Sequence, residues 1–296
     1  MKKIFSFCNQ KGGVGKTTSV INIAAVLSKL GYKVLVVDMD SQANSTSGLG
    51  EEKPTDELTS YQLVVENHPP RELIRKTNFE NLWLIPSNAE LSGAELGLVN
   101  QEKREYRMRQ RIEELKNDFD FILIDCPPSL GLVTVNCLVA SDYIIIPLQC
   151  EYYALEGLGQ LLNTYQMIQS NLHPELEIGG VLLTMADMRT NLTQQVIQEV
   201  REYFKEKVFG NVVPRSVKLS EAPSFGKPAV YYDPSSRGVK SYFEIAEEFI
   251  ERFAQEGKRA KEDGTKNSKI KEEESVSEIV EQPITAEGPA GPEPQN

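Results

Sequence analysis

The chain has 296 residues, 40% hydrophobic and 25% charged, a length and composition that suit one enzyme-sized globular domain. Its 32 Lys+Arg against 43 Asp+Glu give a net charge of −11, which excludes a protein that coats nucleic acid with its whole surface. No apolar run reaches the roughly 18 residues of a membrane-spanning helix, and the four cysteines are scattered without a C-x-x-C pair. We therefore expect a soluble, cytoplasmic protein with buried free thiols.

Short runs rich in valine, isoleucine and phenylalanine alternate along the chain with longer segments of helical periodicity. The predicted strands cover residues 2–9, 33–40, 82–86, 119–125, 143–148, 178–185 and 211–213. The predicted helices cover residues 16–30, 103–117, 131–139, 154–170, 190–207 and 238–255. Strands that are apolar on both faces belong to a parallel sheet. The pattern therefore predicts a doubly wound α/β fold, a mostly parallel sheet flanked by helices on both faces, with ligands at the C-terminal ends of the strands.

The last predicted helix has a broad apolar stripe opposite an acidic face. Such a helix suits docking on its own domain, because anionic lipid would repel its polar face. From residue 257 onward the sequence loses its aromatic residues and becomes rich in Lys, Glu, Gly, Pro and Ser. We expect one folded domain over residues 1–256 and a disordered, polar and acidic tail over residues 257–296. The tail carries 6 Lys+Arg and 9 Asp+Glu, so the folded part keeps a net charge near −8.

A glycine-rich loop follows the first predicted strand and opens the first predicted helix. It reads Lys11-Gly12-Gly13-Val14-Gly15-Lys16-Thr17-Thr18. In such a loop the backbone N–H groups and the helix N-terminus face an anion, and the glycines allow the tight path. Lys16 can reach the β- and γ-phosphates of a nucleotide, and the Thr17 hydroxyl can bind Mg²⁺. The sequence therefore predicts a nucleotide site with ATP and Mg²⁺ as ligands.

The loop departs from the general pattern G-x-x-x-x-G-K-[ST] at its start. Gln10 stands where the first glycine belongs, and Lys11 adds a second lysine. This two-lysine form marks a known family in which the extra lysine reaches the nucleotide of a partner subunit.

A Mg-nucleotide site also needs carboxylates at the ends of neighbouring strands. The predicted strand 33–40 ends in Asp38 and Asp40, and strand 119–125 ends in Asp125. The two histidines, His68 and His173, lie near no motif, so catalysis is expected to depend on positioning and electrostatics.

With these residues in view, the chain resembles the ParA/Soj branch of the deviant-Walker ATPases, the MinD/ParA superfamily. The resemblance covers most of residues 1–255 and is carried by the segments Asn9 to Thr18, Asp38-Met39-Asp40-Ser41-Gln42-Ala43-Asn44, Asp125-Cys126-Pro127-Pro128-Ser129-Leu130-Gly131, Gln149 to Gly157 and Pro214 to Ser224. It implies a slow, partner-stimulated ATPase that segregates chromosomes or plasmids. The ATP-bound form would close into a sandwich homodimer, bind DNA non-specifically on the nucleoid, and release it after hydrolysis stimulated by a ParB-like partner.

The resemblance also assigns roles to individual residues. It makes Lys11, Lys16 and Asp40 catalytic, with Lys11 crossing the dimer interface and Asp40 positioning the attacking water. It places Thr17 and Asp125 at the metal. Relatives often have proline where this chain has Ser41, a departure that would loosen the neighbouring loop and leave the Asp40 carboxylate in place.

The same resemblance implies the remaining contacts of the nucleotide and of DNA. Loop residues 11–18 would bind the phosphates, and Pro214 would pack on the adenine. Arg189 and Lys218 would contact DNA phosphates; relatives often have arginine at the second position, and lysine loses mainly the bidentate geometry.

Three other interpretations stay open. A MinD-type membrane-bound regulator would carry a basic amphipathic helix at its C-terminus, whereas this chain ends in prolines among acidic residues. An electron carrier like the nitrogenase iron protein would need cluster cysteines, for which Cys126 and Cys137 are the conceivable pair. A relative that positions a non-DNA cargo would use the same ATPase cycle. Because the first predicted strand begins at Lys2, we expect the short, chromosomal type without an operator-binding domain.

Overall fold

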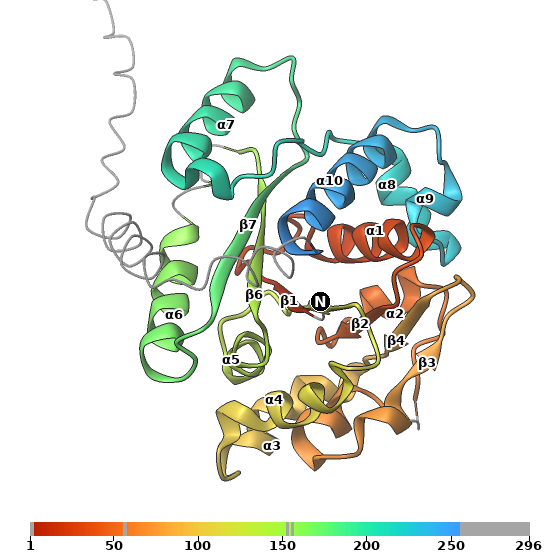
Figure 1. Ribbon diagram of the computed structural model, residues 1–296, viewed down its shortest axis with the longest axis vertical. Helices are drawn as coiled ribbons and strands as arrows, with labels where there is room; N and C mark the ends of the chain where they lie inside the picture. Colours follow the sequence, from red (N-terminus) through yellow and green to blue (C-terminus); the bar gives the residue numbers. More distant parts are fainter. Residues whose placement is uncertain (1–2, 56–57, 152–153, 155–156, 255–296) are drawn as a thin grey trace, which may run out of the picture. The chain divides into compact units, whose positions relative to one another are not determined.

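The computed structural model describes residues 3–55, 58–151, 154 and 157–254. This part contains a seven-stranded sheet with the strand order β3-β4-β2-β5-β1-β6-β7 (Figure 1). The strands are β1 (Lys3–Phe7), β2 (Val34–Asp38), β3 (Arg75–Lys76), β4 (Leu82–Ile85), β5 (Phe121–Asp125), β6 (Tyr143–Gln149) and β7 (Glu177–Thr184). All neighbours pair in parallel except the short edge strand β3, which is antiparallel to β4. The predicted doubly wound, mostly parallel fold is confirmed; the predicted tail, residues 257–296, lies outside the described residues.

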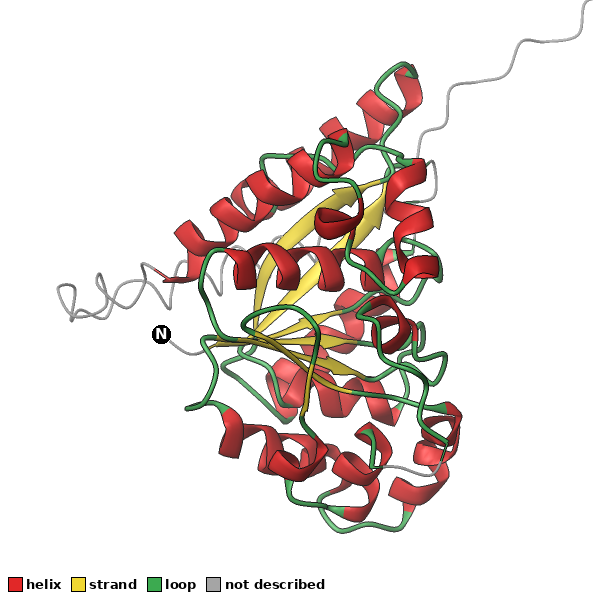
Figure 2. Ribbon diagram, turned by 90° about the vertical axis from the view of Figure 1, so that its right-hand side faces the viewer, coloured by secondary structure: helices red, strands yellow, loops and turns green. Residues whose placement is uncertain are grey.

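Helices flank the sheet on both sides (Figure 2). The α-helices are α1 (Lys16–Lys29), α2 (Asn44–Gly48), α3 (Ala94–Val99), α4 (Arg107–Ile112), α5 (Leu132–Val139), α6 (Leu158–Asn171), α7 (Asn191–Phe204), α8 (Val217–Glu221), α9 (Ala229–Tyr232) and α10 (Arg237–Ala254). Shorter turns of 3₁₀-helix are η2 (Pro70–Leu73), η3 (Ala89–Gly93), η4 (Arg104–Tyr106), η5 (Glu113–Leu115), η6 (Lys205–Lys207) and η7 (Ala222–Phe225), and η1 (Gln62–Glu66) is a π-helix. Every helix in the described ranges is too short or too polar to cross a bilayer.

The two faces of the sheet bury separate cores because successive side chains of a strand point to opposite faces. In β1, Phe5 and Phe7 pack with α1 and α10, whereas Ile4 belongs to the core beneath α4, α5 and α6. The predicted apolar stripe of the last helix packs on the first of these cores. Phe249 of α10 is fully buried, with its ring centroid 4.5 Å from that of Phe5. Docking of this helix on its own domain is thereby confirmed.

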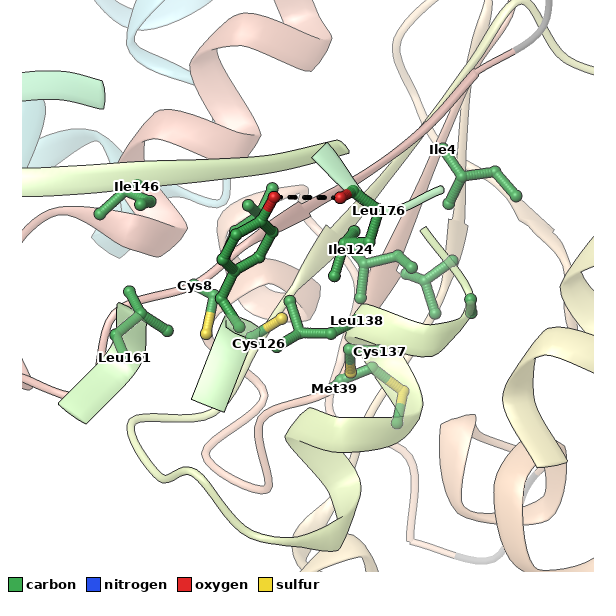
Figure 3. Packing of buried hydrophobic residues seen from close by; sticks show 14 of the residues in the cluster. Ile4, Cys8, Met39, Ile124, Cys126, Cys137, Leu138, Ile146, Leu161 and Leu176 are labelled. Carbon is green, nitrogen blue, oxygen red and sulfur yellow. Dashed lines mark hydrogen bonds between the residues drawn. The ribbon is translucent and has the colours of Figure 1, made fainter. Parts of the chain in front are cut away.

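The cysteines lie in the interior, as expected. All four are free and buried, and Cys8, Cys126 and Cys137 gather with aliphatic side chains in the core on the α5 side of the sheet (Figure 3). Because the Cys126 and Cys137 side chains have no solvent exposure, neither is available at the surface of a subunit. This burial argues against an interfacial cluster of the iron-protein type.

Two predicted elements need correction. The predicted strand 211–213 is not a ladder strand: Val213 exchanges backbone hydrogen bonds with Leu183 and Ala186, and isolated bridges lie on either side of the stretch, Val181 with Val208 and Ala186 with Pro214. Gly210 and Pro214 bracket it, and proline has no N–H to donate to a ladder. The predicted helix 103–117 divides into η4, α4 and η5. The predicted start of helix 154–170 falls partly on residues outside the described ranges, and α6 begins at Leu158.

Candidate nucleotide site

The glycine-rich loop lies where the order in which strands are added to the sheet reverses. From β1 the chain adds β2 and β4 on one side of the sheet and later β6 and β7 on the other. Loops that leave neighbouring strands in opposite directions open a crevice at the carboxyl edge of such a sheet, and ligands of doubly wound folds bind there. The loop between β1 and α1 occupies this crevice.

Three contacts fix the path of the loop. The Asn9 side chain donates to the Pro147 carbonyl at 2.7 Å and accepts from the Lys11 N–H at 3.0 Å. The Thr184 hydroxyl, at the end of β7, donates to the Val14 carbonyl at 2.7 Å. The ends of β6 and β7 thus hold the loop from one side.

The glycines give the loop its shape and leave room over it. Gly13 and Gly15 have φ angles of 74° and 87°, in the left-handed region that favours glycine. A Cβ atom added at Gly12 or Gly13 would meet no heavy atom within 4 Å, so the space beside these two residues is open. Since α1 begins at Lys16, its first N–H groups have no partner within the helix and face the loop. The arrangement is a cradle for an anion.

The two lysines of the loop point in different directions. Lys16 is only 7% exposed, and its Nζ lies 3.3 Å from the Lys11 carbonyl, inside the loop. The Lys11 side chain leaves the loop and forms an ion pair with Glu151, with 2.9 Å between Nζ and Oε2. Both partners of that pair are nearly half exposed, at 44% and 47%. Lys16 therefore serves its own loop, and Lys11 lies at the surface.

The predicted carboxylates meet at the ends of adjacent strands. In the sheet register Asp125 of β5 pairs with Asp38 of β2 on one side and with Phe7 of β1 on the other. One oxygen of Asp125, Oδ2, accepts hydrogen bonds from the hydroxyls of Thr17 and Ser45, each at 2.7 Å. The other, Oδ1, is buried and has no hydrogen-bond partner among the described residues. Burial, reinforced by the charge of Asp38, raises the pKa of Asp125 to about 8.

Asp38 and Asp40 differ in their surroundings. Asp38 is fully buried, and its Oδ2 accepts from both the N–H and the hydroxyl of Thr46, at 2.8 and 2.7 Å. Burial raises the pKa of Asp38 to about 6. Asp40 is half-buried, and its Oδ1 accepts from the Gln42 N–H at 2.9 Å. Asp38 thus fastens α2 to the end of β2, while the Asp40 carboxylate stays within reach of solvent.

These residues fit a bound Mg-nucleotide. The open cradle matches a row of phosphates, the buried Lys16 supplies a positive charge, and the unpartnered Oδ1 of Asp125 is an acceptor for a water of a magnesium hydration shell. Mg²⁺ bound there would neutralise charge on the β- and γ-phosphates. Thr17 is part of the loop, and its hydroxyl is hydrogen-bonded to Asp125. Sequence reasoning gave no individual role to Asn9, Thr184 or Ser45, because the pattern of strands and helices does not show which groups a polar side chain at the end of a strand or in a short helix will contact.

The remaining predicted residues lie beside the continuation of β7. Pro214 is bridged to Ala186, two residues beyond the Thr184 hydroxyl that holds the loop. Arg189 is 88% exposed and paired with Asp187, and Lys218 of α8 is paired with Glu221. A cleft of about 240 Å³ adjoins the loop between α1, α2, α8 and the segment after α8; its lining includes Thr17, Thr18, Asn44, Ser47, Leu219 and Lys227. The structure thus brings the loop and the carboxylates together, and it leaves Arg189 and Lys218, the two residues predicted to contact DNA, on the surface.

Strand, loop, helix and carboxylates together define a P-loop nucleotide-binding protein. Residues 2–178 match a protein family described as AAA domain. The chain is 53% identical to the sporulation initiation inhibitor protein Soj of Bacillus subtilis, over 84% of this chain and 98% of that protein. It is 49% identical to the chromosome partitioning protein ParA of Myxococcus xanthus, over 84% of this chain and 88% of that protein. The chain belongs to the ParA/Soj family of chromosome-partitioning ATPases.

A solved structure agrees with the site. Cobyrinic acid a,c-diamide synthase from Mycobacterium smegmatis, with bound ADP and magnesium, is similar with a TM-score of 0.76 and 33% identity. The match covers 86% of this chain and 96% of that one. A relative of this fold thus binds an adenine nucleotide with the metal to which the carboxylates here are suited.

Proposed function

We propose that the protein is an ATP-hydrolysing DNA-partitioning protein whose ATP-bound form is a homodimer. The observation that carries the proposal is the divergence of the two loop lysines. Lys16 stays inside its own loop, whereas the surface ion pair with Glu151 holds Lys11 where a second subunit can approach. A surface ion pair is weak, so Lys11 can exchange Glu151 for the phosphates of a partner's nucleotide. ATP would then join two subunits as well as supply free energy.

Within one subunit, the cradle of residues 11–18 would bind the phosphates, and Thr17 would ligate Mg²⁺. Asp125, which already accepts from Thr17, would hold a water of the metal shell. Asp40 would orient the attacking water, because it is the carboxylate of the group that is not fully buried. Pro214 would contact the adenine. Hydrolysis by positioning and electrostatics is the usual mode of phosphoryl transfer in P-loop enzymes.

DNA would bind through Arg189 and Lys218. Both side chains are exposed, at 88% and 45%, and the segments that carry them run side by side through the Ala186–Pro214 bridge. One subunit offers few cations in a chain of net charge −11, so dimerisation, which doubles the patch, would be needed for useful affinity. Such binding is non-specific and salt-dependent, which suits residence on the nucleoid and release when a ParB-like partner stimulates hydrolysis.

Mixed dimers of two inactive variants test the shared site. Lys11→Ala and Asp40→Ala should each lose DNA-stimulated and partner-stimulated ATP hydrolysis. If Lys11 acts on the partner's nucleotide, a dimer containing one subunit of each kind has one complete site: Asp40 from the first subunit and Lys11 from the second. A 1:1 mixture should then recover about a quarter of the wild-type rate, since half the dimers are mixed and half of their sites are complete.

The control is a mixture of Lys16→Ala with Asp40→Ala at the same concentrations. Lys16 and Asp40 both serve the site of their own subunit in the proposal, so this mixture contains no complete site and should stay inactive. Should the first mixture stay inactive while the separate proteins fold and dimerise, Lys11 acts within its own subunit and the proposal is wrong.

A further inference from the structure

Both cations assigned to DNA are already occupied by a carboxylate of the same chain. The Arg189 guanidinium makes two hydrogen bonds to Asp187, Nε to Oδ1 at 2.8 Å and a terminal nitrogen to Oδ2 at 2.6 Å. The Lys218 Nζ lies 2.9 Å from Oε2 of Glu221. The bidentate pair uses the same guanidinium geometry that binds a phosphate. A DNA phosphate and the carboxylate therefore compete for one set of donors.

The two pairs belong to one surface. Asp187 follows Ala186, whose carbonyl accepts from the Arg215 N–H at 3.1 Å, and Lys218 lies three residues beyond Arg215. The Arg189 side chain and, to a smaller extent, Arg215 hold the pKa of Asp187 down to about 2. Tyr232 completes the second pair: its hydroxyl donates to Glu221 at 3.2 Å, and its ring centroid lies 5.6 Å from the Lys218 Nζ.

On the basis of the proposed DNA binding, we infer that Asp187 and Glu221 are internal competitors for the DNA phosphates and set how tightly the ATP-bound dimer holds DNA. In the free protein each carboxylate neutralises its cation. When a phosphate takes the cation, the carboxylate is released next to the phosphate and repels it. Affinity falls and dissociation is faster than a bare pair of cations would give. A protein that must leave DNA in each cycle gains a faster exit from this arrangement.

The magnitude follows from Coulomb's law. Two unit charges about 6 Å apart in water repel by an energy that corresponds to about a threefold change in affinity. A dimer carries each carboxylate twice, so removing one kind of carboxylate should tighten DNA binding about tenfold at low salt. The gain should shrink as salt screens the repulsion.

Asp187→Asn and Glu221→Gln are suitable variants because each keeps a local hydrogen bond. An asparagine oxygen can still accept from the Arg189 N–H, as Asp187 Oδ1 does at 3.2 Å, and a glutamine oxygen can still accept from Tyr232. Glu199→Gln is the matched control for net charge. Glu199 is exposed on α7 and forms no ion pair within the described part of the chain.

The experiment measures binding of the full-length protein to a random-sequence double-stranded DNA fragment, by fluorescence anisotropy across a salt series with a non-hydrolysable ATP analogue. Dimer formation is checked in each preparation by light scattering. We expect Asp187→Asn and Glu221→Gln to bind about tenfold more tightly than Glu199→Gln at low salt and to dissociate more slowly in stopped-flow chase experiments.

Equal affinities for the three variants would overturn the inference. Arg189→Glu and Lys218→Glu, measured in the same series, separate that failure from failure of the proposed function. If these two reversals abolish DNA binding while the neutral variants match Glu199→Gln, DNA binds at this surface and the carboxylates do not compete. If the reversals leave DNA binding intact, the surface itself is assigned wrongly.

Discussion

Asp125→Asn should stabilise the nucleotide-free protein, although it removes a residue of the proposed metal site. Asp125 is fully buried beside Asp38, and burial raises its pKa to about 8. At neutral pH the folded protein must therefore keep a proton that the unfolded chain releases. Asparagine has the same shape, its oxygen can still accept from Thr17 and Ser45, and it carries no ionisable proton. Without bound metal, the variant therefore avoids the free energy that the wild type loses at neutral pH by keeping Asp125 protonated.

The sign and size follow from proton linkage. Because the folded pKa of Asp125 lies above the unfolded value of 3.8, its favourable contribution is complete below pH 3.8 and is lost as the pH rises through about 8. Across that window the wild type loses about 1.4 kcal/mol of unfolding free energy per pH unit from this group. Between pH 5 and pH 7 the variant should therefore gain up to about 3 kcal/mol relative to the wild type, or about 5 to 10 °C in melting temperature.

Urea unfolding of both proteins at pH 5 and pH 7, with chelator and without nucleotide, measures this difference directly. Comparing the change between the two pH values cancels any constant effect of the amide group. Adding Mg·ATP should reverse the order, because the nucleotide stabilises a folded protein in proportion to its affinity and the variant has lost an acceptor for the metal shell. If the two proteins change in parallel between pH 5 and pH 7, Asp125 is ionised in the nucleotide-free protein and the reasoning fails.

Lys16→Ala should abolish nucleotide binding and hydrolysis, because it removes the only buried cation of the described loop. Equilibrium dialysis and phosphate-release assays measure both, and wild-type affinity and turnover would contradict the prediction. Asp40→Ala should bind ATP, stay dimeric on DNA and lose turnover, and normal hydrolysis would remove Asp40 from the proposed mechanism. Arg189→Glu should lose DNA binding at physiological salt while it keeps ATP-dependent dimerisation, measured by gel filtration with a non-hydrolysable analogue. Gly15→Ala should destabilise the protein by about 1 to 2 kcal/mol and weaken nucleotide binding, because φ at this residue is 87°; an unchanged urea midpoint would show that the loop can relax.

The sequence predicted those parts of the site that regular structure positions. Apolar strands that end in Asp38 and Asp125 had to bring the two carboxylates to one edge of a parallel sheet, and the register places them opposite each other. Ser45 and Thr46 could not be found in this way. They lie in the five-residue helix α2, whose polar sequence NSTSG has no apolar periodicity, and their hydroxyls reach the carboxylates only through the tertiary path of the chain.

The ion pairs of Lys11, Arg189 and Lys218 were beyond sequence reasoning for a different reason. Exposed pairs depend on the rotamers of long side chains, and several carboxylates near each lysine or arginine in the sequence could have served. The mutual position of strands was predictable because burial of apolar surface dictates it, whereas surface pairing involves small free energies that no pattern records.

The nucleotide site and the segment that carries Lys218 are joined by contacts through α2. Asp38 fixes the start of this helix through Thr46, and the Thr46 hydroxyl accepts from the Ser87 N–H at 3.0 Å. Directly after α2, Gly50 meets Gly226 at the end of η7: a Cβ atom at Gly50 would lie 2.8 Å from the Gly226 carbonyl oxygen. The 3₁₀-helix η7 continues from α8, which carries Lys218. If hydrolysis moves the segment after Asp40, we expect η7 to move with it because Gly50 and Gly226 lie so close together. The proposed coupling of ATP hydrolysis to DNA release would then run through these two glycines rather than through a chain of charged side chains.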